Sequence, residues 1–237
     1  MISSNCVLIA AAVPAELATI DQSLSGKKVL RRGPVELHTG SINGREVATL
    51  VSGAGPVNMA GALGAVFTLQ PPKMVMVTGC GGAFGGSGLL QGDVALATEE
   101  IHGQLGVEDG HPPAPPNDLP FLRNRYPLDH ALVERAFSAF ANRTYAAKHK
   151  VLKGPFLTVA TVTSRADTAA EYRRRYNVIM ENMEGFAATA LCKQYDIPMM
   201  ELRAVSNMVG QTDRSTWKLD LAFERAQEAI LSILEAM

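Results

Sequence analysis

An unbroken apolar run near the start of the chain constrains the fold more than any other feature. Residues 6–12 carry no charged side chain, and such a run is typical of a strand buried on both faces of a parallel sheet. We expect a helix to follow. Pro14 suits a first helical turn, and apolar residues then recur at helical spacing as far as Gly26. A strand that leads into a helix is the unit from which α/β domains are built.

The rest of the chain repeats this alternation, with one hairpin. Residues 35–42 and 45–51 flank Asn43-Gly44, the pair that most favours a type I′ turn, so two antiparallel strands are expected there. Further strands are predicted at 73–78, 93–97, 152–161, 178–180 and 199–206, and further helices at 57–69, 128–142, 166–176, 184–195 and 213–234.

Two segments are predicted to be loops. Residues 79–88 are rich in glycine, and six prolines fall between His111 and Pro127. With no domain linker in view, we predict a single α/β domain over residues 1–237. It should have three layers, with a central mixed, largely parallel twisted sheet flanked by helices.

Composition narrows the classes of partner. The 237 residues carry 22 basic and 23 acidic side chains, for a net charge of −1, which argues against nucleic acid or a membrane surface as partner. The three cysteines, Cys6, Cys80 and Cys192, are odd in number and far apart, so we expect no disulfide framework and no metal site. No Lys or Arg precedes Lys27, so the apolar start does not resemble a secretion signal. These features favour a cytoplasmic protein.

Two glycine-rich turns each lack residues that known phosphate-binding motifs require. Residues 51–58 place Asn58 where a dinucleotide fingerprint has its third glycine, and no acidic residue ends the next strand. Residues 79–84 lack the lysine of a P-loop. Both segments are therefore either plain tight turns or ligand-binding turns in which glycine lets the backbone approach a ligand closely. The residues of these two segments favour neither alternative over the other.

A third segment, at residues 183–184, completes a pattern that is typical of a known family. Met183 and Glu184 lie where a strand meets a helix, although a lone Glu there is more commonly a helix cap. Together with Glu16, four segments resemble in order and spacing the purine nucleoside phosphorylase and uridine phosphorylase superfamily. They are residues 52–58, 78–82 leading to Gly92-Asp93, 183–185 and 203–207.

The resemblance covers nearly the whole chain and is strongest to the nucleosidase branch. Within that branch the chain resembles the futalosine hydrolases, which are relatives of the methylthioadenosine and S-adenosylhomocysteine nucleosidases. The residues that carry this resemblance are Asn207, Gly210, Asp213 and Trp217. This implies hydrolysis of futalosine to hypoxanthine and dehypoxanthine futalosine in menaquinone biosynthesis. It also implies a purine nucleoside with a 5′ substituent and water as substrates, no cofactor, and a homo-oligomer.

The resemblance implies roles for residues around the sugar. Met183 would lie against the ribose, and Glu184 would accept hydrogen bonds from its hydroxyls. Glu16 matches the glutamate that orients and activates the attacking water, although an exposed helix position is the alternative. Phosphorylases carry Gly-Asp-Pro near this point and a phosphate-binding arginine where this chain has residues 98–101, Thr-Glu-Glu-Ile. Because a carboxylate would repel phosphate, hydrolysis is favoured over phosphorolysis.

Other residues are implied to contact the base. Asn207 stands where adenine-specific relatives have aspartate, and its amide can donate to purine N7 and to a 6-oxo group. This indicates a 6-oxopurine, although a helix cap is the alternative. The resemblance also places four further residues along the purine, Cys80, Gly81, Gly82 and Thr163. No histidine is placed near Cys80, so a packing role is favoured over a nucleophile.

The pocket for the 5′ substituent is expected within residues 102–121. Two rival functions remain open on the sequence: a phosphorylase of inosine or guanosine, and a nucleoside-binding module without catalysis.

Overall fold

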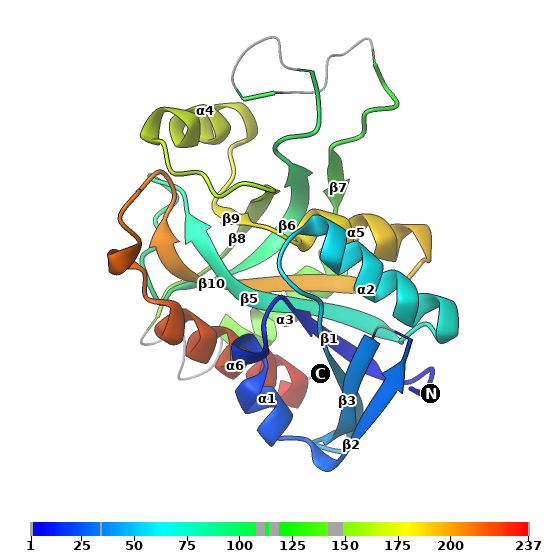
Figure 1. Ribbon diagram of the computed structural model, residues 1–237. Helices are drawn as coiled ribbons and strands as arrows, with labels where there is room; N and C mark the ends of the chain where they lie inside the picture. The colour runs from blue at the N-terminus through cyan, green and yellow to red at the C-terminus, as the bar shows by residue number, and fades with distance from the viewer. Residues whose placement is uncertain (1, 34, 108–111, 114–118, 142–148, 237) are drawn as a thin grey trace.

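A twisted sheet runs through the centre of the molecule, with helices on both of its faces (Figure 1). The computed structural model describes residues 2–33, 35–107, 112–113, 119–141 and 149–236. Within these residues the strands are β1 (Val7–Ala11), β2 (Ser25–Arg32), β3 (Val35–Ile42), β4 (Arg45–Val51), β5 (Met74–Ala83), β6 (Val94–His102), β7 (Arg125–Pro127), β8 (Val151–Thr158), β9 (Met180–Asn182) and β10 (Met199–Met208). The helices are α1 (Ala18–Gln22), α2 (Pro56–Leu69), α3 (His130–Ala141), α4 (Ala166–Tyr176), α5 (Gly185–Gln194) and α6 (Leu219–Ala236), with short 3-10 turns η1 (Pro14–Glu16) and η2 (Arg214–Thr216).

The strand order confirms a mixed sheet. Its path is β10-β6-β8-β9-β5-β1-β4-β3-β2, and β5 also pairs with β10. Strands β4, β1, β5 and β10 run parallel to one another, whereas β2, β3 and β4 form an antiparallel meander. Because β5 pairs with both β9 and β10, half of the sheet closes into a ring. Sequence patterns gave no indication of this closure.

Helices cover both faces, which confirms the three-layer prediction. Helices α3 and α6 bury their apolar sides against one face, around Phe140 and Ile230. Helices α2 and α5 cover the opposite face, around Leu63 and Cys192. Helix α4 packs over the ring near β8 through Tyr172 and its neighbours. None of the described helices is both long enough and apolar enough to cross a membrane.

Short sequence patterns predict several elements correctly. The hairpin between β3 and β4 turns at Asn43 and Gly44, with φ of 51° and 77°, and these positive values are what a type I′ turn requires. Helix α4 has the predicted bounds. The predicted first helix is instead split into η1 and the five-residue α1, and β2, which was not expected, follows it.

The glycine-rich segment after Thr78 differs most from its prediction. The sequence predicts a loop there, but β5 continues through Ala83. Its glycines pair with β10 on one side and β9 on the other. A Cβ at Gly81 would lie 2.8 Å from the carbonyl oxygen of Glu181, so the absence of side chains lets the strands approach. Two smaller shifts are that α6 begins at Leu219 and that Asp213 caps η2 instead.

Candidate active site

One pocket of about 220 Å³ lies at the carboxyl ends of the central parallel strands, where ligands bind in α/β sheets. It contains seven of the eight residues that the sequence indicated: Glu16, Cys80, Gly81, Gly82, Met183, Glu184 and Asn207. The eighth, Thr163, is buried behind the wall, and its neighbour Val162 lines the pocket instead. Of the predicted 5′ region, residues 108–111 and 114–118 lie outside the described part of the chain.

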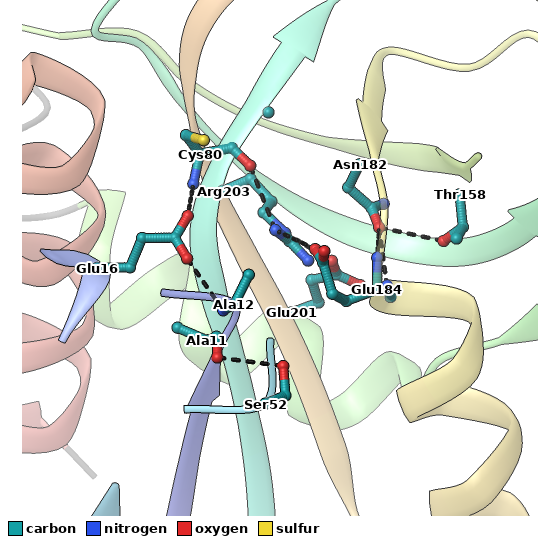
Figure 2. A network of polar contacts seen from close by, with 12 residues as sticks. Ala11, Ala12, Glu16, Ser52, Cys80, Thr158, Asn182, Glu184, Glu201 and Arg203 are labelled. Atoms are coloured by element: carbon teal, nitrogen blue, oxygen red, sulfur yellow. Dashed lines mark hydrogen bonds and ion pairs between the residues drawn. The ribbon is translucent and has the colours of Figure 1, made fainter. Parts of the chain in front are cut away.

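Glu16 is held in the pocket by backbone donors. It follows β1 in the turn η1, and its carboxylate accepts hydrogen bonds from the N–H groups of Ala12 (3.0 Å), Val13 (3.2 Å) and Cys80 (2.9 Å) (Figure 2). These three bonds fix the orientation of the carboxyl group. The side chain is only 2% exposed, so the alternative of an exposed helix residue is wrong.

Gly79 makes room for this carboxylate. Strand β5 lies beside β1, and a Cβ at Gly79 would fall 2.4 Å from Oε1 of Glu16. The residue also has a φ of +144°, which side-chain-bearing residues rarely adopt. The site therefore requires glycine at position 79, because any side chain there would overlap the carboxylate of Glu16.

Glu184 lies across the pocket from Glu16, at the start of α5. Its Oε1 accepts a hydrogen bond from the N–H of Gly55 (2.9 Å), and its Oε2 pairs with Nη1 of Arg203 (3.1 Å). The helix cap is supplied by Asn182, whose Oδ1 accepts from the N–H groups of Glu184 and Gly185 (Figure 2). Glu184 thus occupies the N-cap position of α5, but its side chain makes no capping hydrogen bond and binds Gly55 and Arg203 instead.

Arg203 joins the two sides of the site, although no role for it is predicted from the sequence. Its guanidinium is 2% exposed, and besides Glu184 it contacts Glu201 (Nε to Oε1, 2.8 Å) and the carbonyl of Cys80 (3.2 Å). Burial acts to lower the pKa of Arg203, but the negative charges of Glu201, Glu184 and Glu16 raise it above the ordinary value. Arg203 is therefore a permanent cation beneath the pocket.

A second carboxyl pair lies behind Arg203. A Cβ at Gly185 would be 2.2 Å from Oε2 of Glu201 and 2.3 Å from Oε1 of Glu100, so the two side chains meet there. Burial and the negative charge of Glu201 raise the pKa of Glu100 well above its usual value. Glu100 also accepts hydrogen bonds from Thr158 (2.6 Å) and Asn182 (2.7 Å). Its neutral form lets the pair share a proton. The signal available in the sequence is that Glu100 and Glu201 each directly adjoin apolar residues of a predicted or observed strand.

Asn207 lies near the end of β10 with its amide oriented. Its Oδ1 accepts a hydrogen bond from the hydroxyl of Ser206 (2.7 Å), and its Nδ2 donates one to the carbonyl of Met208 (3.3 Å). These two bonds fix the amide plane, and the second N–H of the NH₂ group remains for a ligand. Asn207 lies within a strand, well before α6 begins at Leu219, so the helix-cap alternative is wrong.

Cys80 has the environment of a packing residue. Burial and then the charge of Glu16 raise the pKa of its thiol to about 12, which leaves it protonated at neutral pH and a poor nucleophile. Its side chain packs against the core between the sheet and α6.

Comparison with known proteins identifies the family of the chain. The sequence profile of the phosphorylase superfamily matches residues 7–237. Futalosine hydrolases of Thermus thermophilus and Acidothermus cellulolyticus are 31% and 30% identical over 81% and 95% of this chain, and 83% and 89% of their own lengths. A 5′-methylthioadenosine/S-adenosylhomocysteine nucleosidase of Bacillus cereus is 30% identical over 85% of the chain and 86% of its own length.

Solved structures show the same fold. A 5′-methylthioadenosine/S-adenosylhomocysteine nucleosidase from Neisseria meningitidis, in complex with methylthio-immucillin-A, has a TM-score of 0.86 at 23% identity and covers 98% of this chain and 100% of its own. The corresponding enzyme from Colwellia psychrerythraea, in complex with adenine, also has a TM-score of 0.86, at 22% identity, and covers 99% of this chain and 96% of its own. The chain therefore belongs to the phosphorylase superfamily and is an enzyme of its nucleosidase branch, an N-glycosyl hydrolase.

Proposed function

We propose that this enzyme hydrolyses the N-glycosidic bond of futalosine, releasing hypoxanthine and dehypoxanthine futalosine in menaquinone biosynthesis. The observation that carries the proposal is the convergence of Glu16, Glu184 and the oriented amide of Asn207 on one pocket. The similarity to two futalosine hydrolases supports it. A methylthioadenosine or S-adenosylhomocysteine nucleosidase is the second candidate, because such relatives match almost equally well.

Glu184 is proposed to bind the sugar. Each of its oxygens already has one partner, but a carboxylate offers about four acceptor sites, so both can accept further bonds from ribose hydroxyls. Cleavage of an N-glycosidic bond develops positive charge on the sugar. A carboxylate fixed by Gly55 and Arg203 stabilises that charge without having to reorient.

Glu16 is proposed to position and activate water. Three backbone N–H groups fix its carboxylate at the pocket wall, and one acceptor site of about four remains for a water proton. Among the described residues that line the pocket, the only cation is Arg203, and Glu184 and Glu201 already neutralise it. A phosphate dianion would therefore face two carboxylates without a free counter-charge, which favours water as nucleophile.

Asn207 is proposed to donate to the departing base. Negative charge develops on the purine as the bond breaks, and an amide N–H aimed at N7 or the 6-oxo group stabilises it. With an adenine base, the donor would face a 6-amino group, and the unpaired contact costs roughly 1–3 kcal/mol, or about ten- to hundredfold in preference.

The test is to incubate the enzyme with futalosine, aminofutalosine, methylthioadenosine and inosine, with and without phosphate, and to identify both products. We expect hypoxanthine and a free sugar from futalosine, at a rate independent of phosphate. A sugar 1-phosphate would refute hydrolysis in favour of phosphorolysis. Faster cleavage of methylthioadenosine would support the second candidate, and stoichiometric binding without base release would indicate a binding module.

A further inference from the structure

Three neighbouring strands place a second polar side chain opposite Asn207. Gly82 in β5 is paired directly with Glu181 in β9 and with Asn207 in β10. Directly paired residues point to the same face of a sheet, and adjacent strands lie about 4.8 Å apart. The backbones of Glu181 and Asn207 are therefore roughly 10 Å apart, and both residues line the pocket.

Strand β5 presents a glycine between these two side chains. Gly82 has no side chain, and a Cβ there would be 2.9 Å from Cγ2 of Val209 and 3.1 Å from Nδ2 of Asn207. Because Gly82 also lines the pocket, a flat base can lie against its backbone, with one edge toward the amide of Asn207 and the other toward the carboxyl group of Glu181.

The carboxyl group of Glu181 is only half satisfied. The residue is 5% exposed, and its Oε1 accepts a hydrogen bond from the N–H of Thr163 (3.0 Å). Its Oε2 is buried and has no hydrogen-bond partner within the described part of the chain. A buried carboxylate oxygen without a donor is unfavourable, so a ligand that brings an N–H group to this point gains a strong bond.

We propose that Glu181 is a specificity-determining residue that accepts a hydrogen bond from N1–H of a 6-oxopurine base. This inference rests on the proposed function and deepens it, since it names the group that recognises the far edge of the base. A 6-oxopurine carries a donor at N1, whereas adenine carries an acceptor there. Glu181 and Asn207 together are complementary to hypoxanthine, with an acceptor facing N1–H and a donor facing N7 or the 6-oxo group.

Protonation of Glu181 should change this preference. Burial raises the pKa of Glu181 to about 7, despite the hydrogen bonds from Thr163. Above that pH the ionised group accepts from N1–H. Below it, the neutral carboxyl group can donate to N1 of adenine. The selectivity for hypoxanthine over adenine therefore rises as the pH rises through about 7.

Several ionisable groups lie near Glu181. Tyr172 of α4 faces it, and burial and the charge of Glu181 raise the pKa of that phenol to about 12. The other ionisable groups of the pocket are Glu16, Glu184, Arg203 and Cys80. The thiol has a pKa raised to about 12, and Arg203 remains charged.

The test is calorimetric titration of the full-length enzyme with hypoxanthine and with adenine at pH 5.5, 7 and 8.5. Wild-type enzyme should favour hypoxanthine about tenfold or more at pH 8.5, and less at pH 5.5. In Glu181→Gln, Thr163 N–H should hold the amide oxygen and leave the NH₂ facing N1. Preference should then shift toward adenine by about ten- to hundredfold, with little dependence on pH.

The control is Glu134→Gln, on the surface of α3 beside Lys153, which should behave like wild type. An unchanged ratio of affinities in Glu181→Gln, or a wild-type ratio that does not vary with pH, would overturn the inference. The wild-type titration decides the point even if the variant fails to fold. Free bases need no cleavage and have no 5′ substituent. Failure to hydrolyse futalosine would therefore refute the proposed function while leaving this measurement intact.

Discussion

Replacement of Glu16 by glutamine tests the catalytic assignment most directly. The carboxylate accepts from three backbone N–H groups, two at Oε2 and one at Oε1. Glutamine has one oxygen, so its better orientation keeps the bonds to Ala12 and Val13 and turns its NH₂ toward the N–H of Cys80. That leaves one buried donor unpaired, at a cost of about 1–3 kcal/mol in the free energy of unfolding.

For a chain of this length, such a loss lowers Tm by roughly 2–12 °C, so the variant should still fold at 25 °C. Glutamine cannot take a proton from water, and loss of a general base typically lowers kcat about 10²- to 10⁴-fold. The assay measures hypoxanthine released from futalosine by chromatography, with hypoxanthine affinity measured by calorimetry. We expect kcat to fall at least a hundredfold in Glu16→Gln while hypoxanthine affinity stays within a few fold. Glu134→Gln is the matched control, and near wild-type turnover in Glu16→Gln would refute the role of Glu16.

Three further predictions test neighbouring parts of the site. Asn207→Asp should shift the ratio of kcat/KM toward 6-amino nucleosides about ten- to hundredfold, and an unchanged ratio for futalosine and aminofutalosine would contradict the role of the amide. Gly79→Ala should displace Glu16, because the new methyl group would overlap its carboxylate, and should abolish turnover, whereas Gly61→Ala in the open face of α2 should not. Glu100 binds a proton more tightly in the folded state than in the unfolded state, so its contribution to stability is full below pH 4 and is lost as pH rises. Thermal melts should therefore show that Glu100→Gln is more stable relative to wild type at pH 8 than at pH 5, and a difference that does not change with pH would contradict the raised pKa.

Features predicted correctly from the sequence are those encoded within a few residues. The apolar run that forms β1 and the turn at Asn43-Gly44 carry their own signals. The extension of β5 through Ala83 does not, because glycine favours turns when it is considered alone. It becomes a strand here because two distant segments, β9 and β10, need close approach to its backbone.

The residues of the site likewise include some that the sequence predicts and some that it does not. Glu16, Glu184 and Asn207 were indicated because their motifs keep a fixed order along the chain, and the structure brings all three to one pocket. Glu181 lies just before the 183–185 segment and has no role predicted from the sequence, since only the pairing of β9 with β5 shows that it faces the same space as Asn207. Thr163 was placed one residue out of register, and its neighbour Val162 lines the pocket.

The charged residues beneath the pocket hold Glu184 in place together, and this arrangement could not be predicted one residue at a time. Glu184, Glu201 and Glu100 converge near Arg203, and the four are almost completely buried. Three ionised carboxylates against one guanidinium would leave excess negative charge in a medium that solvates it poorly. The raised pKa of Glu100 removes one of these charges, so Glu201 can bind Nε of Arg203 while Nη1 remains for Glu184. The position of the Glu184 carboxylate thus depends on a proton held deeper in the sheet, by residues that no local motif connects to it.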